Sequence, residues 1–125
     1  MQEPTATRYP CPCCGYMTFS GPPGGDEACP ICFWEDDGTQ LRWPREEDGL
    51  NSVSLEQAQK NFAECGAAEE SFKTAVRPLG ESDERDAGWR PIAAEDSFEE
   101  APSSAPGPDD PTALYWWRST YWRRS

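Results

Sequence analysis

The 125-residue chain contains no histidine, so Ser-His-Asp and Cys-His catalytic arrangements are impossible and the usual general base is missing. It also has no long apolar run, and hydrophobic residues make up only 36% of the sequence. No stretch is long enough to span a membrane, and no apolar leader follows a basic start. We therefore expect a cytoplasmic protein without a transmembrane segment.

Positive charge is scarce: the chain has 23 Asp and Glu residues but only 11 Lys and Arg residues, which gives a formal net charge of −12. Residues 81–110 alone carry −8, whereas residues 111–125 carry +3. Nucleic-acid-binding domains normally present a basic face. The charge balance therefore disfavours a nucleic-acid partner and favours an unidentified protein partner of basic character.

Cysteine, by contrast, occurs six times and in a specific pattern. Residues 11–15 (CPCCG) and 29–32 (CPIC) each contain a Cys-x-x-Cys turn, or knuckle, and 14 residues separate the two. Two such turns supply the four thiolates that a tetrahedral Zn²⁺ binds at about 2.3 Å. Metal binding would also add folding energy to a chain with little apolar surface to bury. We predict one structural zinc ion bound by Cys11, Cys14, Cys29 and Cys32.

Cys13 remains an alternative ligand. A Cys11-x-Cys13 pair would be a tighter turn, and it would leave Gly15 unexplained, because glycine after the second thiolate permits a positive φ that points backbone N–H groups at sulfur. If it is not a ligand, Cys13 is either a buried small side chain or a reactive thiol beside the site. Two further interpretations are buried thiols without metal and a secreted domain with three disulfides. The two proline-bearing knuckles and the missing leader disfavour both.

The remaining patterns predict a small α+β protein with a rubredoxin-like zinc ribbon followed by two short helices. Residues 16–19 have strand composition, and Phe33-Trp34 would open a second short strand. Ser54 and Gln57 form a capping-box signature before apolar positions at helical spacing, and Gly66 is the expected stop. A second helix is predicted over residues 68–76.

Domain boundaries follow from composition. We expect a folded domain over residues 8–80, with a docking segment that extends to residue 92. Residues 81–110 carry ten acidic residues and few large apolar side chains, which is typical of disorder. Residues 93–125 are therefore predicted to be a disordered acidic linker with an aromatic-basic tail. That tail has four interpretations: contact with a membrane surface, binding of acidic or nucleic-acid partners by stacking and charge, folding back on the acidic segment or the domain, and an extension without a specific partner. The last is favoured, because three arginines in a chain of net charge −12 attract phosphate weakly.

Several of these motifs occur together in one known family. YPCPCCGY at residues 9–16 and CPICFWEDDG at residues 29–38 resemble the bacterial cysteine-rich CPCC family. The similarity continues through four further segments and so covers about residues 8–92; these segments are 51–62, 66–69, 76–78 and 85–92. The resemblance implies a small, zinc-ribbon-like bacterial protein, and some relatives are associated with toxin–immunity systems.

The motifs do not point to a reaction. Glu35, Asp36 and Asp37 form a carboxylate triplet, but a zinc ion with four thiolate ligands has no open position for water. We therefore expect no enzymatic activity, and a structural zinc module that acts through protein–protein interaction in an immunity-like or adaptor-like role. The triplet is a candidate contact for a basic partner.

Two alternative functions use the same residues. A rubredoxin-like electron carrier would bind iron with the four cysteines, although Phe33 stands where a rubredoxin-type knuckle usually has glycine. A nucleic-acid-binding zinc ribbon would use the arginines of the C-terminal tail.

Overall fold

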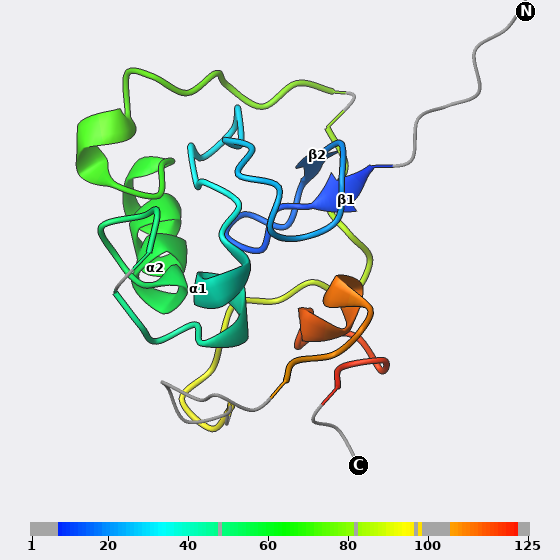
Figure 1. Cartoon of the computed structure of the whole chain (residues 1–125). Coiled ribbons are helices and arrows are strands. Elements are labelled where there is room, and N and C mark those ends of the chain that lie inside the picture. The colour runs from blue at the N-terminus through cyan, green and yellow to red at the C-terminus, as the bar shows by residue number, and fades with distance from the viewer. Residues whose placement is uncertain (1–7, 48, 82, 97, 99–105, 123–125) are drawn as a thin grey trace, which may run out of the picture.

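The computed structural model describes residues 8–47, 49–81, 83–96, 98 and 106–122, and these residues contain few regular elements. The elements are strands β1 (Tyr9–Pro10) and β2 (Met17–Phe19), helices α1 (Gly38–Arg42) and α2 (Leu55–Cys65), and 3₁₀ helices η1 (Glu70–Phe72) and η2 (Pro111–Leu114). Figure 1 shows the hairpin and α2 on opposite sides of a body made largely of irregular chain. The predicted α+β class is confirmed at this level: a two-stranded hairpin and two helices. No described helix is long and apolar enough to cross a bilayer.

The hairpin surrounds the first knuckle. β1 and β2 are antiparallel, with Tyr9 opposite Phe19 and Pro10 opposite Met17, and the register is irregular between Tyr9 and Pro10. The strand expected at residues 16–19 is therefore present as β2. The strand expected at Phe33-Trp34 is not. Phe33 has a φ of 69°, which no strand residue adopts, and a single antiparallel bridge between Ala28 and Glu35 flanks the second knuckle instead.

Helix α2 has the predicted ends. The Ser54 side chain accepts a hydrogen bond from the Gln57 backbone N–H, as an N-cap residue does. Gly66 has a left-handed φ of 82°, and its N–H donates to the Phe62 carbonyl. Leu55, Ala58 and Gln59 are buried against the rest of the chain. Both caps are local in sequence, which is why the pattern identified them.

The second helix predicted over residues 68–76 is wrong, because only η1 forms there. The backbone N–H groups at both ends of this stretch have acceptors outside it: Ala68 donates to the Cys32 carbonyl at 2.7 Å and Arg77 to the Pro30 carbonyl at 3.0 Å. Within the stretch, the N–H groups of Phe72, Lys73 and Ala75 donate to carbonyls three residues earlier, which is the pattern of 3₁₀ turns and not of an α-helix. The short helix α1 was not predicted, and Asp37 caps its start.

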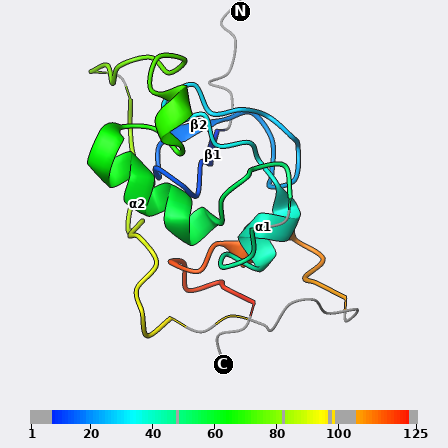
Figure 2. The same ribbon diagram turned by 90° about the vertical axis from the view of Figure 1, so that its left-hand side faces the viewer.

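The C-terminal segment corrects the prediction of disorder. Residues 106–122 include η2, and four of their apolar side chains are buried: Leu114, Tyr115, Trp116 and Tyr121. In Figures 1 and 2 this orange-to-red segment passes below the hairpin and beside α1, which η2 contacts. Large aromatic rings supply buried area that a short chain otherwise lacks. The disorder expected at 97, 99–105 and 123–125 lies outside the described residues.

One buried cluster joins the two ends of the described chain. It contains the knuckle cysteines, Phe19, Ile31 and Trp34 from the N-terminal part and Leu114, Tyr115 and Trp116 from the C-terminal part. The cysteines therefore lie inside the apolar core, where water does not reach them.

Candidate metal centre

The first knuckle is the loop of the β1–β2 hairpin. The Cys11 N–H donates to the Tyr16 carbonyl at 2.9 Å, and the Gly15 N–H donates back to the Cys11 carbonyl at 2.6 Å. Gly15 has a φ of +82°, and a Cβ built on it would lie 2.5 Å from the Trp89 ring. Glycine is thus required here twice, by the backbone conformation and by the close approach of Trp89.

The second knuckle has the same backbone pattern. The Cys29 N–H donates to the Trp34 carbonyl at 2.9 Å, and the Phe33 N–H donates to the Cys29 carbonyl at 2.8 Å. Phe33, with a φ of 69°, takes the left-handed conformation that Gly15 takes in the first knuckle. The Phe33 ring packs edge-on against Phe72, with ring centroids 4.8 Å apart. The missing glycine therefore leaves the geometry of the second knuckle unchanged.

The two knuckles bring four sulfurs together. The Sγ atoms of Cys11, Cys14, Cys29 and Cys32 all lie within 4.8 Å of one another, and all four residues are fully buried. The Cys11–Cys32 and Cys14–Cys29 sulfur pairs are 3.5 and 3.8 Å apart. A tetrahedron with metal–sulfur bonds of 2.3 Å has edges of about 3.8 Å. The four cysteines singled out by their spacing therefore form a group that could hold one metal ion.

Because these thiols are buried, they can ionise together only with a cation nearby to stabilise the thiolates. Loss of water raises the pKa of the Cys11 and Cys32 thiols well above the usual range. Side-chain hydrogen bonds from Cys11, Cys14 and Cys32 lower the pKa of Cys29 instead. A divalent cation would supply the charge that lets all four sulfurs ionise in an apolar interior.

Cys29 has additional donors. The Thr18 hydroxyl lies 3.3 Å and the Ile31 N–H 3.4 Å from its sulfur. Such N–H and O–H contacts to sulfur are typical of ligands that carry thiolate charge, and they orient the ligand toward the metal.

Cys13 and Cys65 lie outside the four-sulfur group. Cys13 is fully buried, and burial raises the pKa of its thiol, although a hydrogen bond with Cys32 lowers it. This burial favours the interpretation of Cys13 as a small core side chain beside the ligands. Cys65 is half-buried at the end of α2, with its sulfur 3.7 Å from the Ala67 carbonyl.

The acidic triplet is engaged within the fold. The Glu35 backbone exchanges two hydrogen bonds with the Asn51 side chain, both 2.9 Å long. Asp36 is only 2% exposed and accepts from the Gly25 N–H, and burial raises its pKa. Asp37 accepts the N–H groups of three residues: Thr39, Gln40 and Leu50. A partner contact at the triplet stays a prediction.

The residues that fix the knuckle carbonyls were not predicted from the sequence. Pro12 accepts hydrogen bonds from the side chains of Gln59 and Trp89, and Cys14 accepts one from Arg85. These donors are distant in sequence from the knuckle, so no local spacing points to them. The sequence signals for this stretch are the resemblance over residues 85–92 and the docking segment expected up to residue 92, and neither assigns a contact to a knuckle carbonyl.

Comparison with known proteins agrees with these motifs. The family profile described as cysteine-rich CPCC matches residues 9–83, which is more than half of the chain. No curated protein matches the chain. The match includes both knuckles and α2, and it ends before residue 92, to which the sequence resemblance extends. The chain belongs to the cysteine-rich CPCC family.

Proposed function

We propose that this protein is a structural zinc module that acts through protein–protein contacts and has no catalytic role of its own. The observation that carries the proposal is the buried group of four sulfurs, with Cys11–Cys32 and Cys14–Cys29 separations close to a tetrahedral edge. Zn²⁺ in a four-thiolate site is structural, because all four coordination positions are filled by protein. Its binding energy then contributes directly to folding.

The charge of the chain supports a basic partner. The formal net charge is −12, and four thiolates around Zn²⁺ add about −2. Such a charge attracts cationic proteins over distances up to the Debye length and repels nucleic acid. An adaptor-like or immunity-like role is consistent with that attraction.

The nucleic-acid alternative receives no support from the C-terminal tail. Stacking on bases requires accessible aromatic rings, yet Tyr115 and Trp116 are 1% and 2% exposed. Arg118, which would contact phosphate, donates to the Asp86 carboxylate. Among the described tail residues, Tyr115, Trp116 and Arg118 are thus part of the fold.

Metal content tests the proposal. Protein purified without added metal should contain one zinc per chain by elemental analysis. Cys11→Ser and Cys29→Ser should lose it, whereas Cys13→Ser, the matched control from the same loop, should keep it. Zn²⁺ is d¹⁰ and colourless, whereas iron bound by thiolates absorbs visible light. Iron in place of zinc, seen as such a chromophore, would contradict the proposed zinc module and support the electron-carrier alternative. Retention of zinc in Cys11→Ser would refute the ligand set.

A further inference from the structure

The proline and second cysteine carbonyls of the two knuckles accept hydrogen bonds from different kinds of donors. In the second knuckle, the carbonyls of Pro30 and Cys32 accept hydrogen bonds from the backbone N–H groups of Arg77 and Ala68, at 3.0 and 2.7 Å. Both donors lie within residues 9–83, the range that the family profile matches. Removing these bonds requires movement of the main chain.

In the first knuckle, side chains contact the equivalent carbonyls. The Pro12 carbonyl accepts from Gln59 Nε2 at 2.9 Å and from Trp89 Nε1 at 3.1 Å. The Cys14 carbonyl accepts from Arg85 Nε at 2.8 Å. Arg85 and Trp89 follow the family-matched range. Pro12 and Cys14 occupy the knuckle positions that Pro30 and Cys32 occupy in the other turn, so their carbonyl groups can be compared directly.

Residues 84–92 form a strap across this knuckle. The strap begins with backbone bonds from Met17 N–H to the Glu84 carbonyl and from Asp86 N–H to the Gly15 carbonyl, both 2.8 Å long. Arg85 then lies between two aromatic rings, with its guanidinium carbon 4.8 Å from the centroids of both Tyr16 and Trp89. The Trp89 ring occupies the space beside Gly15 that a Cβ would need. The strap therefore contacts the loop that carries Cys11 and Cys14 over most of its length.

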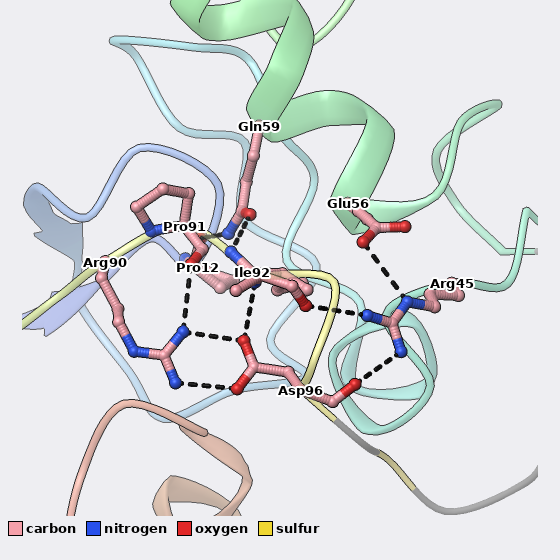
Figure 3. A network of polar contacts seen from close by, with 9 residues as sticks. Pro12, Arg45, Glu56, Gln59, Arg90, Pro91, Ile92 and Asp96 are labelled. Atoms are coloured by element: carbon pink, nitrogen blue, oxygen red, sulfur yellow. Dashed lines mark hydrogen bonds and ion pairs between the residues drawn. The ribbon is translucent and has the colours of Figure 1, made fainter.

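Figure 3 shows how the far end of the strap is attached to α2. Gln59 points between the two segments: it donates to Pro12 and accepts from the Ile92 N–H at 2.8 Å. Arg90, within the strap, donates two hydrogen bonds of 2.7 and 2.8 Å to the Asp96 carboxylate just after it. A single side chain of α2 thus joins the knuckle to the strap.

The strap is also joined to the C-terminal segment. The Asp86 carboxylate accepts from the Trp117 indole N–H at 2.7 Å and from two guanidinium nitrogens of Arg118 at 3.0 and 3.1 Å. The aromatic tail is therefore bonded to the strap through the Asp86 carboxylate, in addition to its packing in the cluster around the cysteines.

We propose that the strap controls metal exchange: the first knuckle is the half of the centre that opens, and Arg85 and Trp89 are positioning residues that set how fast metal leaves. Side chains change rotamer faster than main-chain hydrogen bonds open, so Pro12 and Cys14 lose their donors more readily than Pro30 and Cys32. Opening this loop removes Cys11 and Cys14 from the ion together. This inference rests on the zinc site proposed above.

Zinc release from the full-length, zinc-loaded protein to an excess of a chromogenic chelator tests the strap. Arg85→Ala removes the donor to Cys14 and should accelerate release about fivefold, as expected for the loss of one hydrogen bond of ordinary strength. Arg77→Ala is the matched control, because the Arg77 backbone N–H still donates to Pro30. The Arg77 side chain donates to the Pro78 carbonyl and the Asp83 carboxylate, and neither bond involves a knuckle carbonyl. The release rate should therefore stay within about twofold of wild type. Equal rates in the two variants would overturn the proposal.

Two further measurements do not depend on the folding of Arg85→Ala. Trp89→Phe keeps an aromatic ring at this position and removes the indole donor, and it should release zinc about threefold faster. In the unaltered protein, hydrogen exchange should give the Gly15 amide a lower protection factor than the Phe33 amide, its equivalent in the second knuckle. Equal protection factors for the two amides, or a wild-type rate of zinc release from Trp89→Phe, would refute the proposed role of the strap and leave the proposed function untouched. Absence of zinc from the wild-type protein would instead refute the proposed function.

Discussion

Substituting Gly15 by alanine is the sharpest test of how the first knuckle is packed. Two costs are expected. A non-glycine residue at a φ of +82° costs about 1–2 kcal/mol. The new Cβ would also lie 2.5 Å from Trp89 Cδ2, so the ring has to move, and such overpacking costs about 1–3 kcal/mol. Together, the free energy of unfolding should fall by about 2–5 kcal/mol.

Gly66 provides a matched control for this substitution. It also has a φ of +82°, but a Cβ built there meets no atom within 4 Å. Gly66→Ala should therefore show the conformational cost alone, about 1–2 kcal/mol. Thermal unfolding of the zinc-loaded proteins measures both, and at roughly 4 °C per kcal/mol the Tm should drop by about 8–20 °C for Gly15→Ala and 4–8 °C for Gly66→Ala.

The difference between the two variants isolates the contact with Trp89. In a Gly15→Ala/Trp89→Ala double variant the steric conflict is absent, so the loss of stability should be smaller than the sum of the single losses. Equal drops in Tm for Gly15→Ala and Gly66→Ala, or strict additivity in the double variant, would show that Trp89 does not pack on the knuckle and would remove a central contact of the strap.

Three other predictions follow from described contacts. Stripping the metal with a chelator should abolish the tertiary structure, because the energy of metal binding is folding energy; near-ultraviolet circular dichroism should collapse, and restoration by zinc alone distinguishes this from irreversible damage. Ser54→Ala should destabilise the protein by about 1 kcal/mol through loss of the α2 cap, with the exposed Ser52→Ala as control in the same thermal assay. Burial raises the pKa of Tyr115 above its usual range. Since the folded state favours the neutral phenol, this contribution to stability is complete below the unfolded pKa of about 10 and is lost as pH rises further. Ultraviolet titration should show Tyr115 ionising only together with alkaline unfolding, and a Tyr115→Phe variant should lose that absorbance step.

Elements whose signals are local in sequence were predictable. Ser54, Gln57 and Gly66 determine the ends of α2 through contacts within a few residues. The knuckles likewise have their turn chemistry in the motif itself, so spacing favours Cys11, Cys14, Cys29 and Cys32 and leaves Cys13 as an alternative; the structure brings together the favoured four. Even Phe33, which lacks the conformational freedom of glycine, follows the backbone pattern of the first knuckle.

Elements that depend on distant partners were not predictable. The stretch from Ala68 to Arg77 has helical composition, but it forms 3₁₀-type turns, and its two ends are bonded to the second knuckle. Tyr115 and Trp116 lie in a segment next to acidic, proline-containing sequence, and composition averages conceal that their rings are buried. Arg85 and Trp89 are separated from Pro12 and Cys14 by more than seventy residues. Their role follows only from the folded chain.

The shared buried cluster leads us to expect that the two ends of the described chain unfold together. Because Leu114, Tyr115 and Trp116 pack in the same cluster as the knuckle cysteines, the tail cannot detach without exposing the walls of the metal site to water. A fragment truncated after residue 83, where the family match ends, would lack both the strap and these rings. The stretch that defines the family by sequence is therefore smaller than the stretch that packs around the sulfurs, and we expect an alteration near the C-terminus to affect the metal site.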